Sequence, residues 1–171
     1  IFLFLWPGIG FTIMNILLTR SDSDFEMEAL KKLSSAKVLD VGCGTGRTAI
    51  KIAKRLDNCA FLTGMDIYNK AAIKGNALET VQKNALLEGV AEKTHFQYGS
   101  AIAIPFEDNS FDIVNFSSVL HELHMEEGPK KALQEAYRVL KPGGYLYIEE
   151  WNRSSWQLVM YSGVFCFVFK K

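Results

Sequence analysis

A strand that passes into a helix through three alternating glycines constrains this chain more than any other feature. Residues 38–41 form a short, mainly apolar run with valine at both ends, which is typical of a buried strand. Residues 48–56 then carry apolar side chains at helical spacing. Gly42, Gly44 and Gly46 therefore lie where the strand becomes the helix. Glycine accepts positive φ and allows close backbone approach, and a helix N-terminus offers free N–H groups, so this turn predicts a nucleotide-binding site.

Strands and helices alternate along the rest of the chain. The pattern predicts helices over residues 25–33, 71–87 and 130–140, and further strands over residues 60–67, 94–98, 111–117 and 145–150. Because proline cannot continue a helix and glycine accepts a turn, we expect Lys141-Pro142-Gly143-Gly144 to end the last helix sharply. The alternation predicts an α/β fold, a Rossmann-like, doubly wound, mostly parallel sheet with helices on both faces.

Composition narrows the classes of protein and partner. A chain of 171 residues suits one α/β domain with a real core. Its 19 basic and 19 acidic residues cancel and form no basic block, so we expect no nucleic-acid partner. The three cysteines, Cys43, Cys59 and Cys166, are isolated and odd in number. This spacing argues against a zinc site or a disulfide framework and favours a reducing, cytoplasmic setting.

Both ends of the chain are unusually apolar. Residues 1–18 carry only Thr12 and Asn15 as polar side chains, and residues 156–169 form a second apolar stretch. We divide the chain into an apolar N-terminal segment, residues 1–20, and a ligand-binding domain, residues 21–171. The stretches are short for a bilayer span, and Pro7 interrupts the first, so we expect a lid or a packed edge. Membrane contact through these ends is the alternative.

The spacing of the glycines separates two classes of nucleotide-binding protein. Dinucleotide-binding dehydrogenases favour G-x-G-x-x-G, whereas this chain has G-x-G-x-G preceded by Asp40. That pattern resembles motif I of the class I S-adenosylmethionine-dependent methyltransferases. Residues 104–112 resemble the L-P-F-x-D-x-S-F-D block of that family, and residues 135–144 resemble its E-x-x-R-x-L-K-P-G-G block.

Several motifs in the same order are more specific than one. Over residues 37–150 the chain is similar to small-molecule methyltransferases of the methyltransferase domain 11 type, which include ubiquinone and menaquinone biosynthesis enzymes. Members of that family usually continue with a further helix and an antiparallel pair of strands. Residues 151–171 leave too little room for these, and residues 164–169 supply one strand at most. The C-terminal strands are therefore expected to be incomplete.

The resemblance implies an S-adenosylmethionine site at the carboxyl ends of the strands. Its implied residues are Asp40, Gly42, Cys43, Gly44, Gly46, Asp66, Ile67, Ser100, Ala101 and Ser117. The glycine loop is expected to hold the methionine half, Asp66 the ribose hydroxyls and Ile67 the adenine face. Ser100 stands where relatives commonly have an aspartate, so weaker cofactor binding is expected. Cys43 is expected to act through its backbone and not as a nucleophile.

Ser117 opens the region that in this family lies near the reactive sulfonium. His121 follows and is a candidate general base or acceptor-orienting group, with a structural role as the alternative. His121 and His124 are three residues apart, but no third ligand is evident, so we expect no metal. Glu149 and Glu150 end the last predicted strand and line either the acceptor side or an exposed edge.

These features predict an S-adenosylmethionine-dependent methyltransferase that leaves S-adenosylhomocysteine as its product. The acceptor is expected to be small, and the apolar ends favour a lipophilic one such as a quinone precursor or a lipid. Two alternatives remain at this point. One is a module that binds S-adenosylmethionine without turnover, and the other is an NAD-dependent oxidoreductase. The oligomeric state and the acceptor atom are not predicted.

Overall fold

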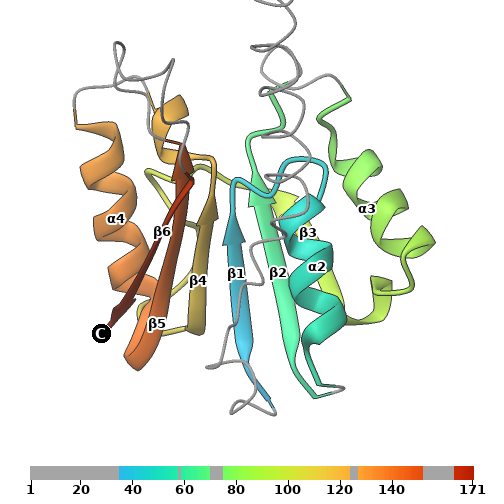
Figure 1. Cartoon of the computed structure of the whole chain (residues 1–171), viewed down its shortest axis with the longest axis horizontal. Coiled ribbons are helices and arrows are strands. Elements are labelled where there is room, and N and C mark those ends of the chain that lie inside the picture. The colour runs from blue at the N-terminus through green and yellow to red at the C-terminus, as the bar shows by residue number, and fades with distance from the viewer. Residues whose placement is uncertain (1–34, 58, 70–74, 124–126, 152–163) are drawn as a thin grey trace, which may run out of the picture.

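A computed structural model describes residues 35–57, 59–69, 75–123, 127–151 and 164–171 (Figure 1). The predicted helix over residues 25–33 and the apolar segment over residues 1–20 lie outside the described residues. Among the described residues, no helix has the length and the apolar content that crossing a membrane requires.

Six strands form a single sheet in the order β3-β2-β1-β4-β5-β6 (Figure 1). The strands are β1 (Lys37–Val41), β2 (Phe61–Asp66), β3 (Thr94–Tyr98), β4 (Phe111–Ser117), β5 (Leu140–Trp151) and β6 (Val164–Lys170). The first five strands pair in parallel, and β6 pairs antiparallel with β5. This sheet confirms the predicted doubly wound, mostly parallel fold. In the described part of the chain, the C-terminal region adds the one strand that the sequence allowed.

Helices cover both faces of this sheet. In the described part of the chain they are α2 (Arg47–Arg55), α3 (Leu78–Leu87) and α4 (Gly128–Val139). The 3₁₀ turn η2 (Ala91–Lys93) precedes β3, and η3 (Leu120–Glu122) follows β4. Successive strand residues point to opposite faces, and on β1 Val38 joins the core under α2 and α3 while Leu39 joins the core under α4. The strand order reverses between β1 and β4, and ligands of such sheets bind at the carboxyl ends beside this switch point.

The helix predicted over residues 71–87 begins later than expected, at Leu78. Gly75 has φ of +80°, and Ala77 is extended, so the helix cannot pass through them. Between them the buried Asn76 donates a hydrogen bond to Asp66. This tertiary contact is invisible to helical periodicity; residues 70–74 lie outside the described part of the chain.

The segment Lys141-Pro142-Gly143-Gly144 is not the free turn that the sequence predicted. The preceding helix does end at Val139, but β5 begins at once with Leu140. The strand register runs from the pair Phe111–Leu140 to the pair Ile113–Tyr145, so the four residues bulge out of the ladder. A bulge accommodates the extra residues without ending the strand.

Candidate cofactor and acceptor site

The glycine loop between β1 and α2 has the backbone that its sequence predicts. Gly42, Gly44 and Gly46 have φ of 72°, 53° and 90°, in the left-handed region that other residues rarely adopt. The Gly42 N–H donates to the Met65 carbonyl at 2.7 Å, which ties the loop to β2. A Cβ on Gly46 would lie 2.7 Å from Val81 Cγ2 on α3. The loop is therefore closed to side chains and presents backbone at the start of α2.

Asp66 at the end of β2 lies directly against this loop. Its Oδ2 accepts a hydrogen bond from Gly44 N–H at 2.9 Å, and its Oδ1 accepts from Tyr68 N–H at 2.6 Å and from Asn76 Nδ2 at 3.3 Å. The predicted loop and acid are thus brought together. Ile67, the next residue, is 62% exposed, as a residue open to a ligand must be. The ribose and adenine roles of Asp66 and Ile67 stay predictions.

Cys43 of the glycine loop contacts Tyr68, which follows β2. The Tyr68 hydroxyl lies 3.6 Å from Cys43 Sγ, and the Tyr68 ring packs edge-on against Tyr98 with centroids 5.0 Å apart. Burial raises the pKa of the Cys43 thiol well above its usual range. A protonated, buried thiol is a poor nucleophile, which agrees with the backbone role expected for Cys43. Sequence reasoning missed Tyr68, whose φ of 49° gives no sequence signal.

Asp40 and Asn115 form a fully buried polar pair beneath the loop. They lie opposite each other on β1 and β4, and Asn115 Nδ2 donates to Asp40 Oδ1 at 2.6 Å. Burial raises the pKa of Asp40 from 3.8 to about 7, and the nearby Asp66 adds to that rise. The sequence analysis missed Asn115, although a single amide inside an otherwise apolar strand is a usable signal.

A second polar chain crosses the site at the carboxyl end of β4. Thr48 Oγ1 on α2 donates to Ser117 Oγ at 3.3 Å, and Ser117 Oγ donates to Glu149 Oε2 at 3.2 Å. The predicted site residue Ser117 is thereby held between the start of α2 and the end of β5. The carboxyl ends of β1, β2, β4 and β5 all contribute to one polar region.

Glu150 organises the segment that carries His121. Its Oε1 accepts hydrogen bonds from the backbone N–H groups of Val119 and Leu120, both at 2.7 Å. Its Oε2 lies 2.7 Å from His121 Nδ1, and Glu122 Oε1 lies 3.1 Å from the other ring nitrogen, Nε2. The Glu150 side chain is 17% exposed and that of Glu122 is 51% exposed. Nδ1 is therefore the fixed side of the ring, and Nε2 is the side that can change partner.

The loop after β3 carries Ser100 and Ala101. Ser100 makes an isolated antiparallel bridge with Ala103, and Ala101 is buried in the core under α4. Both residues follow the carboxyl end of β3, as predicted. Their cofactor roles stay predictions. His124, the second histidine of the metal hypothesis, lies outside the described residues.

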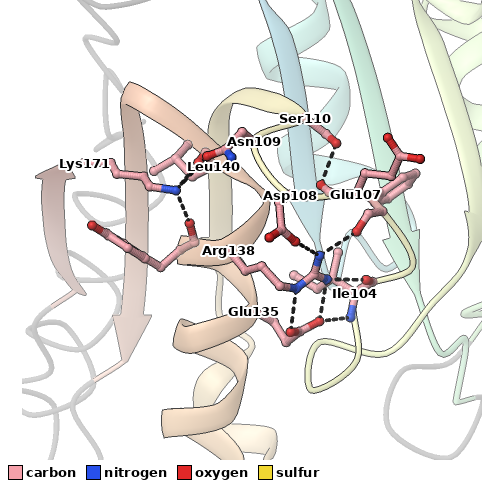
Figure 2. A network of polar contacts seen from close by, with 11 residues as sticks. Ile104, Glu107, Asp108, Asn109, Ser110, Glu135, Arg138, Leu140 and Lys171 are labelled. Atoms are coloured by element: carbon pink, nitrogen blue, oxygen red, sulfur yellow. Dashed lines mark hydrogen bonds and ion pairs between the residues drawn. The ribbon is translucent and has the colours of Figure 1, made fainter.

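Arg138 of α4 fixes the segment that follows this loop (Figure 2). Its guanidinium group pairs with both oxygens of Glu135, with Nε–Oε1 and Nη2–Oε2 at 2.8 Å. It also donates to the carbonyl groups of Ile104 and Phe106 at 2.8 Å and to Asp108 Oδ1 at 2.9 Å. The two sequence blocks that carry the family resemblance thus contact each other and hold this loop in place.

The residues present fit a cofactor such as S-adenosylmethionine. The loop backbone and the start of α2 can hold an amino-acid group, and a Cβ on Gly42 would collide with Val119. Asp40 Oδ2 is buried beneath the loop without a hydrogen bond among the described residues, and Asp66 adds a second acidic side chain beside the loop. Together these features suit a ligand that is both polar and positively charged.

Comparison with known proteins agrees with this geometry. Residues 39–148, well over half of the chain, match the model of the methyltransferase domain family. The chain belongs to this family of class I S-adenosylmethionine-dependent methyltransferases. The methyltransferase domain is 33% identical over 141 residues to a ubiquinone/menaquinone biosynthesis C-methyltransferase from Ruegeria sp., covering 82% of this chain and 52% of the relative.

Solved structures share the fold of this methyltransferase domain. An S-adenosylmethionine-dependent methyltransferase from Methanosarcina mazei is 27% identical with a TM-score of 0.61, covering 74% of this chain and 57% of that one. The [4+2]-cyclase SpnF is 32% identical with a TM-score of 0.61, covering 75% and 43%. The chain spans about half the length of the curated relatives that it matches.

Proposed function

We propose that this chain is the cofactor-binding and catalytic part of an S-adenosylmethionine-dependent methyltransferase that acts on a small, lipophilic acceptor, a reduced quinone. The observation that carries the proposal is the left-handed glycine loop bound to Asp66 at the switch point of the sheet. The family match supports the cofactor, and the G-x-G-x-G spacing speaks against an NAD-dependent oxidoreductase. The Ruegeria relative is a ubiquinone/menaquinone biosynthesis C-methyltransferase, which supports a quinone acceptor.

Different residues of this chain would bind different parts of the cofactor. The glycine loop would hold the methionine half, and Ile67 would pack on the adenine. The Asp66 carboxylate would exchange its hydrogen bond from the loop N–H for hydrogen bonds from the ribose hydroxyls. When bound, S-adenosylmethionine supplies a methyl group activated by a positive sulfur, and the product is S-adenosylhomocysteine. The protein then contributes mainly proximity and alignment.

His121 is the group that would take a proton from the acceptor. A hydroquinone is a weak carbon nucleophile until a ring hydroxyl loses its proton, so a C-methyltransferase gains from a base beside that hydroxyl. A proton on His121 Nδ1, donated to Glu150 Oε2, would leave Nε2 as the nitrogen that takes the proton of the acceptor. Glu122, which is half exposed, can move aside to free Nε2.

A second candidate function is S-adenosylmethionine binding without methyl transfer. The [4+2]-cyclase SpnF shares this fold at 32% identity, and a cyclase is named for a reaction other than methyl transfer. Ser100 in place of an aspartate also favours weaker cofactor use. The two candidates differ in whether the methyl group leaves the cofactor.

A methyl-transfer assay separates these candidates. The chain is incubated with S-adenosylmethionine labelled in its methyl group and with naphthoquinones that lack a ring methyl, in reduced and in oxidised form. We expect label in the organic product with the reduced quinone only, because only the hydroquinone has a hydroxyl proton to lose. Label in neither product, together with saturable cofactor binding, would favour the candidate without turnover.

A further inference from the structure

Two buried acceptor atoms beneath the glycine loop have no hydrogen-bond donor among the described residues. They are Asp40 Oδ2 and Asn115 Oδ1, and they belong to side chains that already touch through Asn115 Nδ2 and Asp40 Oδ1. A buried acceptor without a donor costs about 1–3 kcal/mol. Two such atoms on one contacting pair call for a shared explanation.

A single proton on Asp40 would satisfy both atoms. A carboxylic acid and a carboxamide that face each other can form two antiparallel hydrogen bonds. In one the amide N–H donates to the carboxyl oxygen, which is the 2.6 Å contact from Asn115 to Asp40. In the other the acid O–H donates to the amide oxygen. An ionised Asp40 has no such proton and leaves Asn115 Oδ1 unpaired.

The groups around Asp40 favour this neutral form. Asp66 at the end of β2 and Glu149 at the end of β5 are both acidic, and the thiol of Cys43 is protonated. The hydrogen bonds from Asn115 and from the backbone N–H of Ala49 lower the pKa of Asp40, but burial outweighs them. Burial without a cation among these neighbours raises the pKa of Asp40 to about 7.

We propose that Asp40, which faces Asn115 beneath the glycine loop, is a neutral acid in the free protein, and that S-adenosylmethionine binding releases this proton to solvent. The inference rests on the proposed function. The methionine ammonium group brings a positive charge to the loop that directly follows Asp40, and an ionised carboxylate offsets that charge. One O–H bond of Asp40 breaks, and the buffer accepts the proton.

Calorimetric titration with S-adenosylmethionine in two buffers of different ionisation enthalpy counts the released protons. We expect release of roughly three-quarters of a proton at pH 6.5 and about a tenth at pH 8, from a group that titrates near 7. The Kd should fall by up to about tenfold per pH unit below 7 and level off above it. 5′-Methylthioadenosine lacks the ammonium group and should bind without this release.

Two variants assign the proton to the pair. Asp40→Asn has no proton to lose and should bind with a pH-independent Kd. Asn115→Leu removes the amide that lowers the pKa of Asp40, so the midpoint of proton release should move to higher pH. A purely structural role for Asn115 would change stability and leave that midpoint in place.

Three outcomes would overturn the inference. Wild-type protein that binds S-adenosylmethionine without proton release contradicts it while leaving the proposed function intact. Undiminished release in Asp40→Asn assigns the proton to another group. Absence of S-adenosylmethionine binding overturns the proposed function as well. If Asp40→Asn does not fold, the wild-type proton count and the 5′-methylthioadenosine control still decide.

Discussion

At the scale of single residues, the site depends on carboxylates whose neighbours give them different roles. Asp66 accepts three hydrogen bonds and ties the glycine loop to β2. Asp40 faces an amide and two acids and favours its neutral form. Glu150 accepts two backbone N–H groups and fixes His121. Hydrogen-bond partners and burial, not residue type, set these differences.

The Glu150→Gln variant tests the positioning of His121. The amide retains an oxygen for Val119 and Leu120, but its N–H₂ group faces His121 Nδ1 and forces that atom to accept. The proton then moves to Nε2, which can no longer act as a base. We expect kcat to fall about 100-fold with the KM of the acceptor nearly unchanged.

Glu122→Gln is the matched control, because Glu122 contacts the other ring nitrogen and is half exposed. It should change kcat by less than about threefold. Nitrogen NMR of the ring should show Nδ1 protonated in the wild type and Nε2 protonated in Glu150→Gln. An equal loss of kcat in both variants would contradict the assigned role of Glu150.

The raised pKa of Asp40 also predicts how the free energy of unfolding changes with pH. Its pKa is about 7 in the folded protein and near 3.8 when unfolded, so the folded state binds more protons between these values. The contribution of Asp40 to the free energy of unfolding therefore falls as pH rises through this window. Relative to wild type, Asp40→Asn should gain stability between pH 4 and pH 8, by on the order of a few kcal/mol.

Urea unfolding at pH 4.5 and pH 8, without cofactor, measures this difference. The two proteins should be closest in stability at pH 4.5 and farthest apart at pH 8. A stability difference that is the same at both pH values would show that Asp40 is ionised in the folded protein.

At the scale of elements, α4 and the loop after β3 are held together by one guanidinium group. Arg138→Met keeps the alkyl stem but removes all the hydrogen bonds to Glu135, Asp108 and the two carbonyl groups. We expect a loss of about 2 kcal/mol in the free energy of unfolding, since the partly buried Glu135 carboxylate loses its charged partner and keeps only the hydrogen bond from Ile104 N–H. Lys130→Met, on the same helix in an exposed pair with Glu127, should change it by less than about 0.5 kcal/mol.

Both values can be measured by urea unfolding at neutral pH. Arg138 also fixes the segment that directly follows the loop with Ser100, so cofactor affinity should weaken in Arg138→Met and stay constant in Lys130→Met. If the two variants lost equal stability, the Arg138 network would contribute no more to the free energy of unfolding than an exposed ion pair does.

The elements also show what the sequence could predict. β3 and β4 have the predicted bounds. For β4 the reason is an almost continuously buried run between polar turns, which leaves little choice of where the strand begins and ends. The start of α3 was wrong because Asn76 is held by Asp66, a contact that sequence periodicity cannot show. β5 begins earlier than predicted because a bulge absorbs residues that read as a turn.

Within the site, motif residues were predictable and their partners were not. The glycine loop and Asp66 follow from spacing, since a strand-to-helix turn and the next strand end meet at one edge of the sheet. Asn115 and Glu150 act through contacts between strands distant in sequence. Such contacts depend on register, which one sequence does not reveal.

At the scale of the whole molecule, the switch in strand order is what assembles the site. β1 lies between β2 and β4, so the loop after β1 touches Asp66 on one side, while on the other Asn115 of β4 contacts Asp40 of β1. β5 then adds Glu149 and Glu150 from beyond β4. The central claim is that this loop binds S-adenosylmethionine.

Gly42→Ala and Gly89→Ala form a matched pair for testing that claim. Their φ values of 72° and 71° give both alanines the same backbone strain. A Cβ on Gly42 would collide with the side chain of Val119, which lies beside the glycine loop. A Cβ on Gly89 would meet open space after α3. Only the first change alters the site.

Calorimetric titration of the wild type and both variants with S-adenosylmethionine, and of the wild type with NAD, is the most direct measurement. We expect saturable S-adenosylmethionine binding in the wild type and in Gly89→Ala, at least a tenfold weaker Kd in Gly42→Ala, about 1.4 kcal/mol or more, and no NAD binding. NAD binding in place of S-adenosylmethionine, or equal affinity in all three proteins, would contradict the account.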